Sequence, residues 1–149
     1  MCAAAVISLA ALLRRHAHVL QGAAYDWGEA FAARNLVVKP ALDAVLNTQF
    51  GELARRNGDE FLAMLSAEFA RDSHRSEEWS AALVKYALEQ KPELSEVLRG
   101  WISTWQPRAD QAVSALAGLF ETAPKPMQAP EVIKAVNTQR EAYRGAIGL

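Results

Sequence analysis

The chain has 149 residues, of which 51% are hydrophobic and 22% are charged, and its formal net charge at pH 7 is -1. An apolar fraction of this size is enough for a packed core in one domain, which excludes a disordered chain. Because positive and negative side chains nearly balance, the charge favours neither nucleic acid nor an anionic membrane as a partner. Cys2 is the one cysteine, so the sequence can form no internal disulfide and has no cysteine pair for zinc.

The first 23 residues have the spacing of an amphipathic helix. Mostly apolar side chains recur every three or four positions, at Val6, Leu9, Leu12, Leu13, His16, Val19 and Leu20. Arg14 and Arg15 follow the apolar run, whereas the positive charges of an export signal precede it. The run is also shorter than the roughly 20 residues of a membrane-spanning helix. We therefore expect a cytoplasmic protein.

A second helix is predicted from about residue 24 to residue 56. Pro40 lacks an amide donor and restricts the residue before it, so we expect a kink or break there before the helix resumes. Gly58 suits the left-handed position after a helix, and Asp59 can cap a third helix over residues 60–90. At 1.5 Å per residue the third helix is on the order of 45 Å long, a length typical of helical bundles.

The rest of the chain predicts two more helical segments and a linker. After Lys91-Pro92-Glu93 the expected stripe, which restarts at Pro107, consists of Leu94, Val97, Trp101, Trp105, Ala109, Val113, Leu116 and Phe120. Three prolines lie between residues 122 and 130 and indicate an extended linker. No stretch alternates like a strand, so we predict an all-α bundle with a helical domain at 1–121, the linker at 122–130 and a C-terminal helix at 131–149.

The second predicted helix places two carboxylates in apolar surroundings. Asp26 and Glu29 are three residues apart and share a helical face next to Trp27 and Phe31. Such surroundings predict that at least one of the two carboxylates is buried and paired. The alternative is that both belong to the first helical turn, where the positive end of the helix dipole stabilises them.

The third predicted helix carries charge in the middle of its expected core face. Its buried side is predicted to contain Phe61, Leu65, Trp79, Leu83 and Tyr86. Continuing the same side through the middle of the helix passes Glu68, Asp72 and Arg75. The core face therefore becomes charged halfway along the helix.

Glu68 and Arg71 have the spacing of the Glu-x-x-His pair that binds iron in ferritin-like carboxylate proteins. Arginine has no lone pair to donate, so Arg71 cannot replace the histidine. We expect no metal and no catalytic residue in this chain, and instead a buried ion-pair network at the vestigial metal position. Its candidate members are Asp26, Glu29, Glu68, Arg71 and Asp72. The alternative is a solvated face whose pairs are worth roughly 0.2–0.5 kcal/mol each.

Three separated blocks of the sequence resemble one family. They are the Asp26-Trp27-Gly28-Glu29 block with Asn35 to Pro40, the segment from Arg71 to Tyr86, and the segment from Trp101 to Asp110. In this order they resemble the β subunit of bacterial multicomponent toluene and phenol monooxygenase hydroxylases, and the second block is closer to the toluene branch. The resemblance covers about residues 24–121, whereas residues 1–23 match poorly. It implies a ferritin-like bundle that corresponds to the C-terminal part of a longer subunit.

The family resemblance also implies a function and partners. In this family the hydroxylase is a dimer of α, β and γ protomers, and the α subunit carries the di-iron site. The implied role is a cytoplasmic scaffold without its own cofactor, which contacts the α subunit, the γ subunit and the second protomer of the hydroxylase dimer. Two alternatives stay open, a free-standing helical interaction module and a small metal or hydrophobic-ligand enzyme. If half of the helices are absent, an uncovered apolar patch should favour self-association or partner binding.

Overall fold

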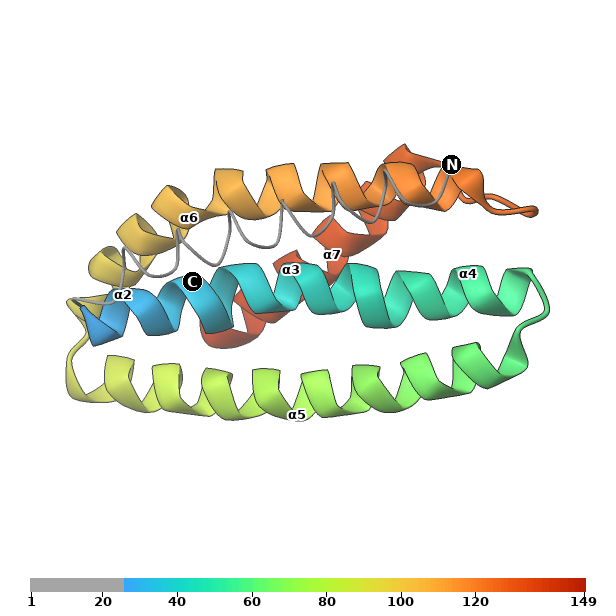
Figure 1. Ribbon diagram of the computed structural model, residues 1–149. Helices are drawn as coiled ribbons and strands as arrows, with labels where there is room; N and C mark the ends of the chain where they lie inside the picture. Colours follow the sequence, from blue (N-terminus) through green and yellow to red (C-terminus); the bar gives the residue numbers. More distant parts are fainter. Residues whose placement is uncertain (1–25) are drawn as a thin grey trace.

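The computed structural model describes residues 26–149, and every regular element in this range is a helix (Figure 1). The predicted all-α class is therefore confirmed for these residues, whereas the helix expected over residues 1–23 lies outside them. In chain order the elements are α2 (Trp27–Phe31), η1 (Ala32–Val38), α3 (Lys39–Asp43), η2 (Ala44–Gln49), α4 (Phe50–Arg56), α5 (Glu60–Gln90), α6 (Leu94–Ala117), η3 (Gly118–Thr122) and α7 (Ala129–Ile147).

The first five elements form one continuous helical rod, so the predicted break at Pro40 is wrong. Two π-helical stretches, η1 and η2, separate the α-helical parts of the rod, and Pro40 stands in the first turn of α3. Val38 and Lys39 both keep right-handed helical backbone angles. The wider π turns rearrange the hydrogen-bond ladder around a residue that cannot donate, and the chain therefore passes Pro40 without leaving the helix.

The turn between the rod and α5 agrees with its sequence prediction. Gly58 has a φ of 83°, a left-handed conformation that costs glycine little. The side chain of Asp59 accepts a hydrogen bond of 2.9 Å from the amide of Leu62 and so caps α5. Helix α5 begins at Glu60 and ends at Gln90, as predicted, and it runs antiparallel to the rod (Figure 1).

The predicted buried face of α5 is wrong. The side that packs on the rod carries small residues, whose buried members are Ala63, Ser66, Ser80 and Val84. By contrast Phe61, Trp79 and Tyr86 are 71%, 61% and 62% exposed. The reason is close helix packing: a methyl group added at Gly51 of α4 would lie 2.9 Å from the Cβ atom of Ser66. Large side chains do not fit between helices this close, so they lie outside this contact, and Trp79 packs edge-on against Phe31 of α2 with ring centroids 6.2 Å apart.

Helix α6 is also longer than predicted, because it passes through Pro107 without a restart. Trp105 and the four residues predicted after it in the stripe are buried, while Val97 is exposed and Trp101 is partly buried. The chain turns after η3 through residues 123–128 and enters α7 two residues before the predicted start. This connection is held at the α4–α5 turn, where Asn57 bonds both backbone groups of Lys125, at 2.8 and 3.1 Å.

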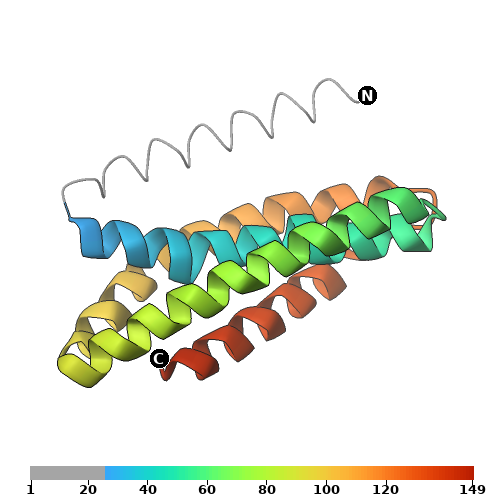
Figure 2. The same ribbon diagram turned by 90° about the horizontal axis from the view of Figure 1, so that it is seen from below.

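The core lies where α6 and α7 pack on the rod, with α5 on the outer side of the rod. Figure 2 shows α5 crossing in front of the rod and α7 lying beside it. The largest fully buried apolar side chains come from the rod, α6 and α7, and they are Leu36, Val37, Val45, Val113, Val132, Val136 and Ile147. The core therefore uses one face of the rod and only the small-residue face of α5.

Candidate functional site

The two carboxylates of α2 have separate roles. The side chain of Asp26 is the N-cap of α2 and accepts hydrogen bonds from the amides of Gly28 and Glu29, at 2.8 and 3.2 Å. Glu29 is half-buried and accepts a hydrogen bond of 2.9 Å from the indole Nε1 of Trp105. The predicted bond of one carboxylate is therefore present at Glu29, but its partner is an indole and no arginine, and Glu29 is not fully buried. Asp26 follows the alternative, a carboxylate at the start of a helix.

The charged residues of α5 do not form the predicted buried network. Arg71 donates to Glu68 at 2.7 Å and Arg75 donates to Asp72 at 2.9 Å, each pair within one helical turn. All four side chains are more than half exposed. They lie on the outer side of α5 because the inner side packs closely on the rod and admits only small residues. The prediction of burial is therefore wrong for Glu68, Arg71 and Asp72 within the described chain, and the solvated-face alternative describes them.

These residues do not fit a di-iron centre. Glu68 and Arg71 have the spacing of a glutamate–histidine metal pair, but the Glu68 oxygen is bonded to the Arg71 guanidinium, which cannot bind a metal ion. Between residues 26 and 149 no group of three or more histidine, cysteine, aspartate or glutamate side chains is placed to hold a metal ion.

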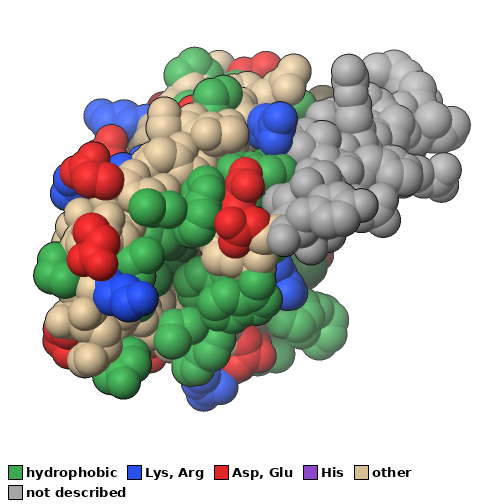
Figure 3. Space-filling model, turned by 90° about the vertical axis from the view of Figure 1, so that its left-hand side faces the viewer, with side chains coloured by type: hydrophobic (Ala, Val, Ile, Leu, Met, Phe, Trp, Pro, Cys, Tyr) green, Lys and Arg blue, Asp and Glu red, His purple; other side chains and the backbone are tan. Residues whose placement is uncertain are grey.

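An apolar cavity of about 260 Å³ opens at the end of the molecule where α2, the end of α5 and the start of α6 meet. Hydrophobic side chains gather over this face in Figure 3. The lining residues are Trp27, Gly28, Phe31, Leu83, Val84, Ala87, Leu94, Leu98 and Trp101. Trp27 stacks on Phe31 with ring centroids 5.7 Å apart and is nevertheless 75% exposed. The cavity is thus part of an exposed apolar surface, of the kind that marks an interaction site.

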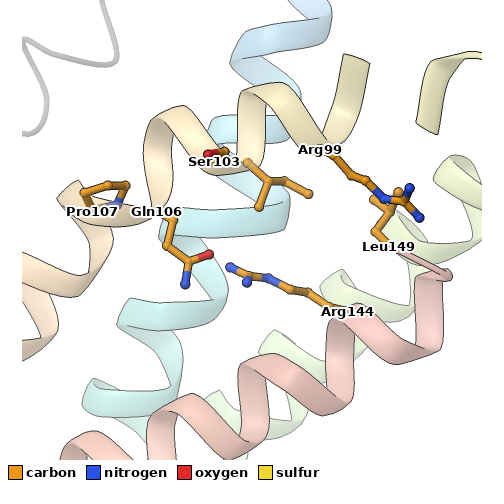
Figure 4. A pocket seen from close by; sticks show the side chains of 7 residues that line it. Arg99, Ser103, Gln106, Pro107, Arg144 and Leu149 are labelled. Carbon is orange, nitrogen blue, oxygen red and sulfur yellow. The ribbon is translucent and has the colours of Figure 1, made fainter. Parts of the chain in front are cut away.

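Sequence reasoning missed a pair of arginines on α7. Arg140 is 4% exposed, and it donates to Asp110 of α6 at 2.6 Å and to Asn137 at 3.2 Å. One turn later, Arg144 points from α7 toward Gln106 of α6 across an open groove of about 470 Å³ (Figure 4). Burial lowers the pKa of Arg144, and the nearby Arg140 lowers it further.

A sequence signal for Arg140 existed. Helix α7 repeats buried residues at three- and four-residue spacing, namely Val132, Val136, Arg140, Tyr143 and Ile147. A charged residue in such a stripe is expected to be buried and paired.

A second missed group is a polar layer between the rod, α5 and α7. Glu77 of α5 faces the Lys39–Asp43 ion pair of α3, and Tyr143 of α7 lies close to it. Burial raises the pKa of Glu77 above 4.5, opposed by the nearby His74 and reinforced by Asp43. Burial also raises the pKa of Tyr143 to about 12, with a further contribution from the charge of Glu77. The layer therefore favours the neutral forms of both acids.

We expect Glu77→Gln to stabilise the protein near neutral pH. A carboxyl group with a raised pKa in the folded state binds its proton more tightly there than in the unfolded chain. The free energy of unfolding therefore falls as pH rises from 4.5 through the folded-state pKa. Glutamine cannot ionise, so the variant should match the wild type below pH 4.5 and exceed its melting temperature near neutral pH. Glu78→Gln is the matched control because Glu78 is 64% exposed. If Glu77→Gln were less stable than the wild type near neutral pH, the pKa of Glu77 would not be raised in the folded protein.

A long antiparallel helix pair covered on one side by two further helices places the chain among the ferritin-like helical proteins. The sequence profile of the methane/phenol/alkene hydroxylase family matches residues 12–91. The chain belongs to this family.

Two relatives are similar to the chain over most of its length. The β subunit of the hydroxylase component of the toluene-4-monooxygenase system of Ectopseudomonas mendocina is 40% identical over 105 residues, which are 70% of this chain and 32% of the relative. The phenol 2-monooxygenase oxygenase component DmpL of Pseudomonas sp. strain CF600 is 34% identical over 93 residues, which are 62% of this chain and 28% of the relative. The predicted resemblance is confirmed, and the chain spans less than a third of the length of both relatives.

None of the helices between residues 26 and 149 combines the length and the hydropathy that a bilayer-crossing segment requires.

Proposed function

We propose that the protein is a structural, β-type subunit of a di-iron monooxygenase hydroxylase that oxidises aromatic hydrocarbons. In this role it packs against and positions an α subunit that holds the iron, and it contacts the γ subunit and the second protomer of the hydroxylase dimer. The two relatives support the proposal, because their names describe hydroxylase or oxygenase components.

The observation that carries the proposal is the ion pair between Arg71 and Glu68. Three residues after a glutamate, an iron-binding helix of this fold carries a histidine whose imidazole donates a lone pair to the metal. Here the residue three positions after Glu68 is Arg71, and its guanidinium forms an ion pair with the Glu68 carboxylate at 2.7 Å. The helix thus keeps the spacing of a metal helix while its side chains neutralise each other. A companion subunit therefore has to supply the iron and the oxygen chemistry.

The exposed apolar surfaces support a packing role. The cavity at the α2–α6 end and the large side chains on the outer side of α5 stay uncovered within the described chain. Covering them with another polypeptide gains roughly 25 cal/mol for each Å² of apolar surface removed from water.

The test is co-expression of the tagged chain with the iron-containing large subunit of the same hydroxylase. We expect a stoichiometric complex in which iron and activity on an aromatic hydrocarbon depend on the large subunit. The chain alone is expected to bind no iron and to oxidise nothing when electrons are supplied. Iron or turnover in the isolated chain would overturn the proposal. Failure to form any complex with the large subunit would also overturn it and would favour the free-standing interaction module.

A further inference from the structure

The groove between α6 and α7 contains an arginine without a counter-ion. Its volume is about 470 Å³, and Arg144 of α7 lines it (Figure 4). Arg99, which also lines the groove, pairs with Glu96 at 3.2 Å. Arg140, one turn before Arg144, pairs with Asp110 at 2.6 Å. The Arg144 side chain forms no ion pair and no hydrogen bond in the described chain, so the groove has one positive charge without a partner.

The unpaired guanidinium has the donor geometry that fits a carboxylate. Nε and Nη2 of Arg144 are both buried and donate to no group between residues 26 and 149. These two nitrogens form one edge of the planar guanidinium, and their parallel N–H groups match the two oxygens of a carboxylate. Burial lowers the pKa of Arg144, and the nearby Arg140 lowers it further. Asp110 and Glu141 oppose this shift, but neither forms an ion pair with Arg144. The surroundings of Arg144 therefore favour a bound anion.

The other side chains of the groove favour an anion that has an apolar part. Arg99, Ser103 and Gln106 follow each other at steps of four and three residues, so they lie on one face of α6, across the groove from Arg144 (Figure 4). All three can donate hydrogen bonds, and no side chain that lines the groove in the described chain is a carboxylate. The remaining lining residues are apolar, namely Ile102, Pro107 and Leu149. An organic anion thus finds donors for its charge and apolar surface for its carbon atoms.

We propose that the groove between α6 and α7 binds a carboxylate that carries an apolar group, with Arg144 as its main anchor. Because Arg99 and Arg140 already have partners, Arg144 adds a single positive charge, which matches one carboxylate better than a doubly charged phosphate. Arg144 is only partly buried, so rotation of its side chain brings the Nε–Nη2 edge to the ligand. Gln106 donates its amide from the opposite wall. This inference does not rest on the proposed function, because the residues that form the site all belong to this chain.

Titration of the whole chain with benzoate tests the site. Benzoate is a carboxylate on an apolar ring, and benzamide is its uncharged analogue. We expect benzoate to bind with a dissociation constant of about 1 mM or below and to shift the NMR signal of the Arg144 Nε–H group. Benzamide and inorganic phosphate should each bind at least about tenfold more weakly. Benzoate that binds no more tightly than either of them, or that leaves the Arg144 signal in place, would overturn the proposal.

Substitutions at Arg144 test whether the guanidinium anchors the ligand. Arg144→Met removes the charge and its donors, so benzoate binding should weaken at least about tenfold. Arg144→Lys keeps the charge without the two parallel donors and should restore only part of the loss. Arg75→Met is the matched control, because Arg75 is 76% exposed on α5 and lies outside the groove, and it should bind benzoate like the wild type.

The stability of Arg144→Met checks that the arginine does not serve the fold. Without benzoate the variant should melt no lower than the wild type, because Arg144 has no partner to lose in the described chain. Circular dichroism measures the melting temperature. A clearly lower value would show that the arginine is part of the packing, and it would overturn the proposal.

The complex with the large hydroxylase subunit separates two sources of the carboxylate, a free organic acid and an acidic side chain of a partner. If benzoate binds the chain equally well alone and in the complex, the groove serves a free acid. If assembly blocks benzoate and Arg144→Met weakens assembly, a carboxylate of the partner occupies the groove. Both results support the site. Failure of the complex to form would contradict the proposed function, would leave a free acid as the ligand, and would not change the titration of the isolated chain.

Discussion

Asp110→Ala is expected to lower the stability of the protein by about 3 kcal/mol, the low end of the range for breaking a buried ion pair. Arg140 is 4% exposed and Asp110 is the carboxylate that neutralises it, with Nη1 and Oδ1 2.6 Å apart. The remaining partner of Arg140 in the described chain is the neutral side-chain oxygen of Asn137. Removing Asp110 leaves a buried positive charge next to Arg144. The low end applies because the Asp110 side chain is 47% exposed.

Because both arginines are largely buried, Asp110→Ala should cost more stability than the removal of one partner from a surface ion pair. Nη2 of Arg140 and both Nε and Nη2 of Arg144 are buried and donate to no partner within the described residues. Unsatisfied buried donors cost about 1–3 kcal/mol each, and Asp110→Ala would leave Nη1 of Arg140 without its charged partner as well. For a chain of this length, 3 kcal/mol corresponds to a fall in melting temperature of roughly 6–12 °C.

Arg140→Met provides the matched comparison. Methionine removes the buried charge and its unpaired donor while it keeps much of the side-chain volume, so we expect a change of less than about 1.5 kcal/mol. The double variant of Asp110→Ala and Arg140→Met should recover most of the stability that Asp110→Ala loses. Urea unfolding at one protein concentration measures all three variants. Equal losses for Asp110→Ala and Arg140→Met would show that the pair acts through packing and that its charge contributes little.

The parts of the fold that the sequence predicted correctly are decided by local chemistry. Gly58 and Asp59 act within one turn of the chain, so the end of the rod and the whole span of α5 could be predicted from composition and capping rules. Pro40 and Pro107 were misjudged because their effect is not local. The helices continue through both prolines. Packing on neighbouring helices and the π turns of the rod offset the cost that proline has in an isolated helix.

The candidate site shows where helical spacing stops being informative. The spacing placed the large and the charged residues of α5 on one face, but it could not decide whether that face meets the rod. We assigned the large side chains to the core, whereas the approach of Gly51 to Ser66 reserves that side for small residues. The same choice placed Glu68 and Asp72 inside when they lie outside. Glu29 was correctly expected to be bonded, but a partner 76 residues away cannot be found by spacing.

Trp105→Ala is expected to destabilise the protein by about 3–5 kcal/mol, the range for removing a large aromatic side chain from a core. Trp105 is 4% exposed and connects three parts of the fold. It belongs to the core cluster, its Nε1 donates to Glu29 of α2 at 2.9 Å, and the guanidinium of Arg108 lies 4.5 Å from its ring centroid. Alanine would leave a cavity between α6 and the rod and would remove the donor to Glu29. The midpoint of urea unfolding, followed by circular dichroism, measures the loss.

Trp105→Phe and Trp27→Ala separate the contributions to this loss. Phenylalanine keeps most of the apolar volume but has no N–H, so it should cost about 1 kcal/mol, the low end for a lost partner, because Glu29 is only half-buried. Trp27 is 75% exposed, and its replacement by alanine should change the stability by less than about 1 kcal/mol. The expected loss of stability therefore depends on how deeply each tryptophan is buried and on the hydrogen bond from Trp105 to Glu29. If Trp27→Ala destabilised the chain as much as Trp105→Ala, the apolar surface at the α2–α6 end would have to be covered in solution, and the stability would then depend on protein concentration.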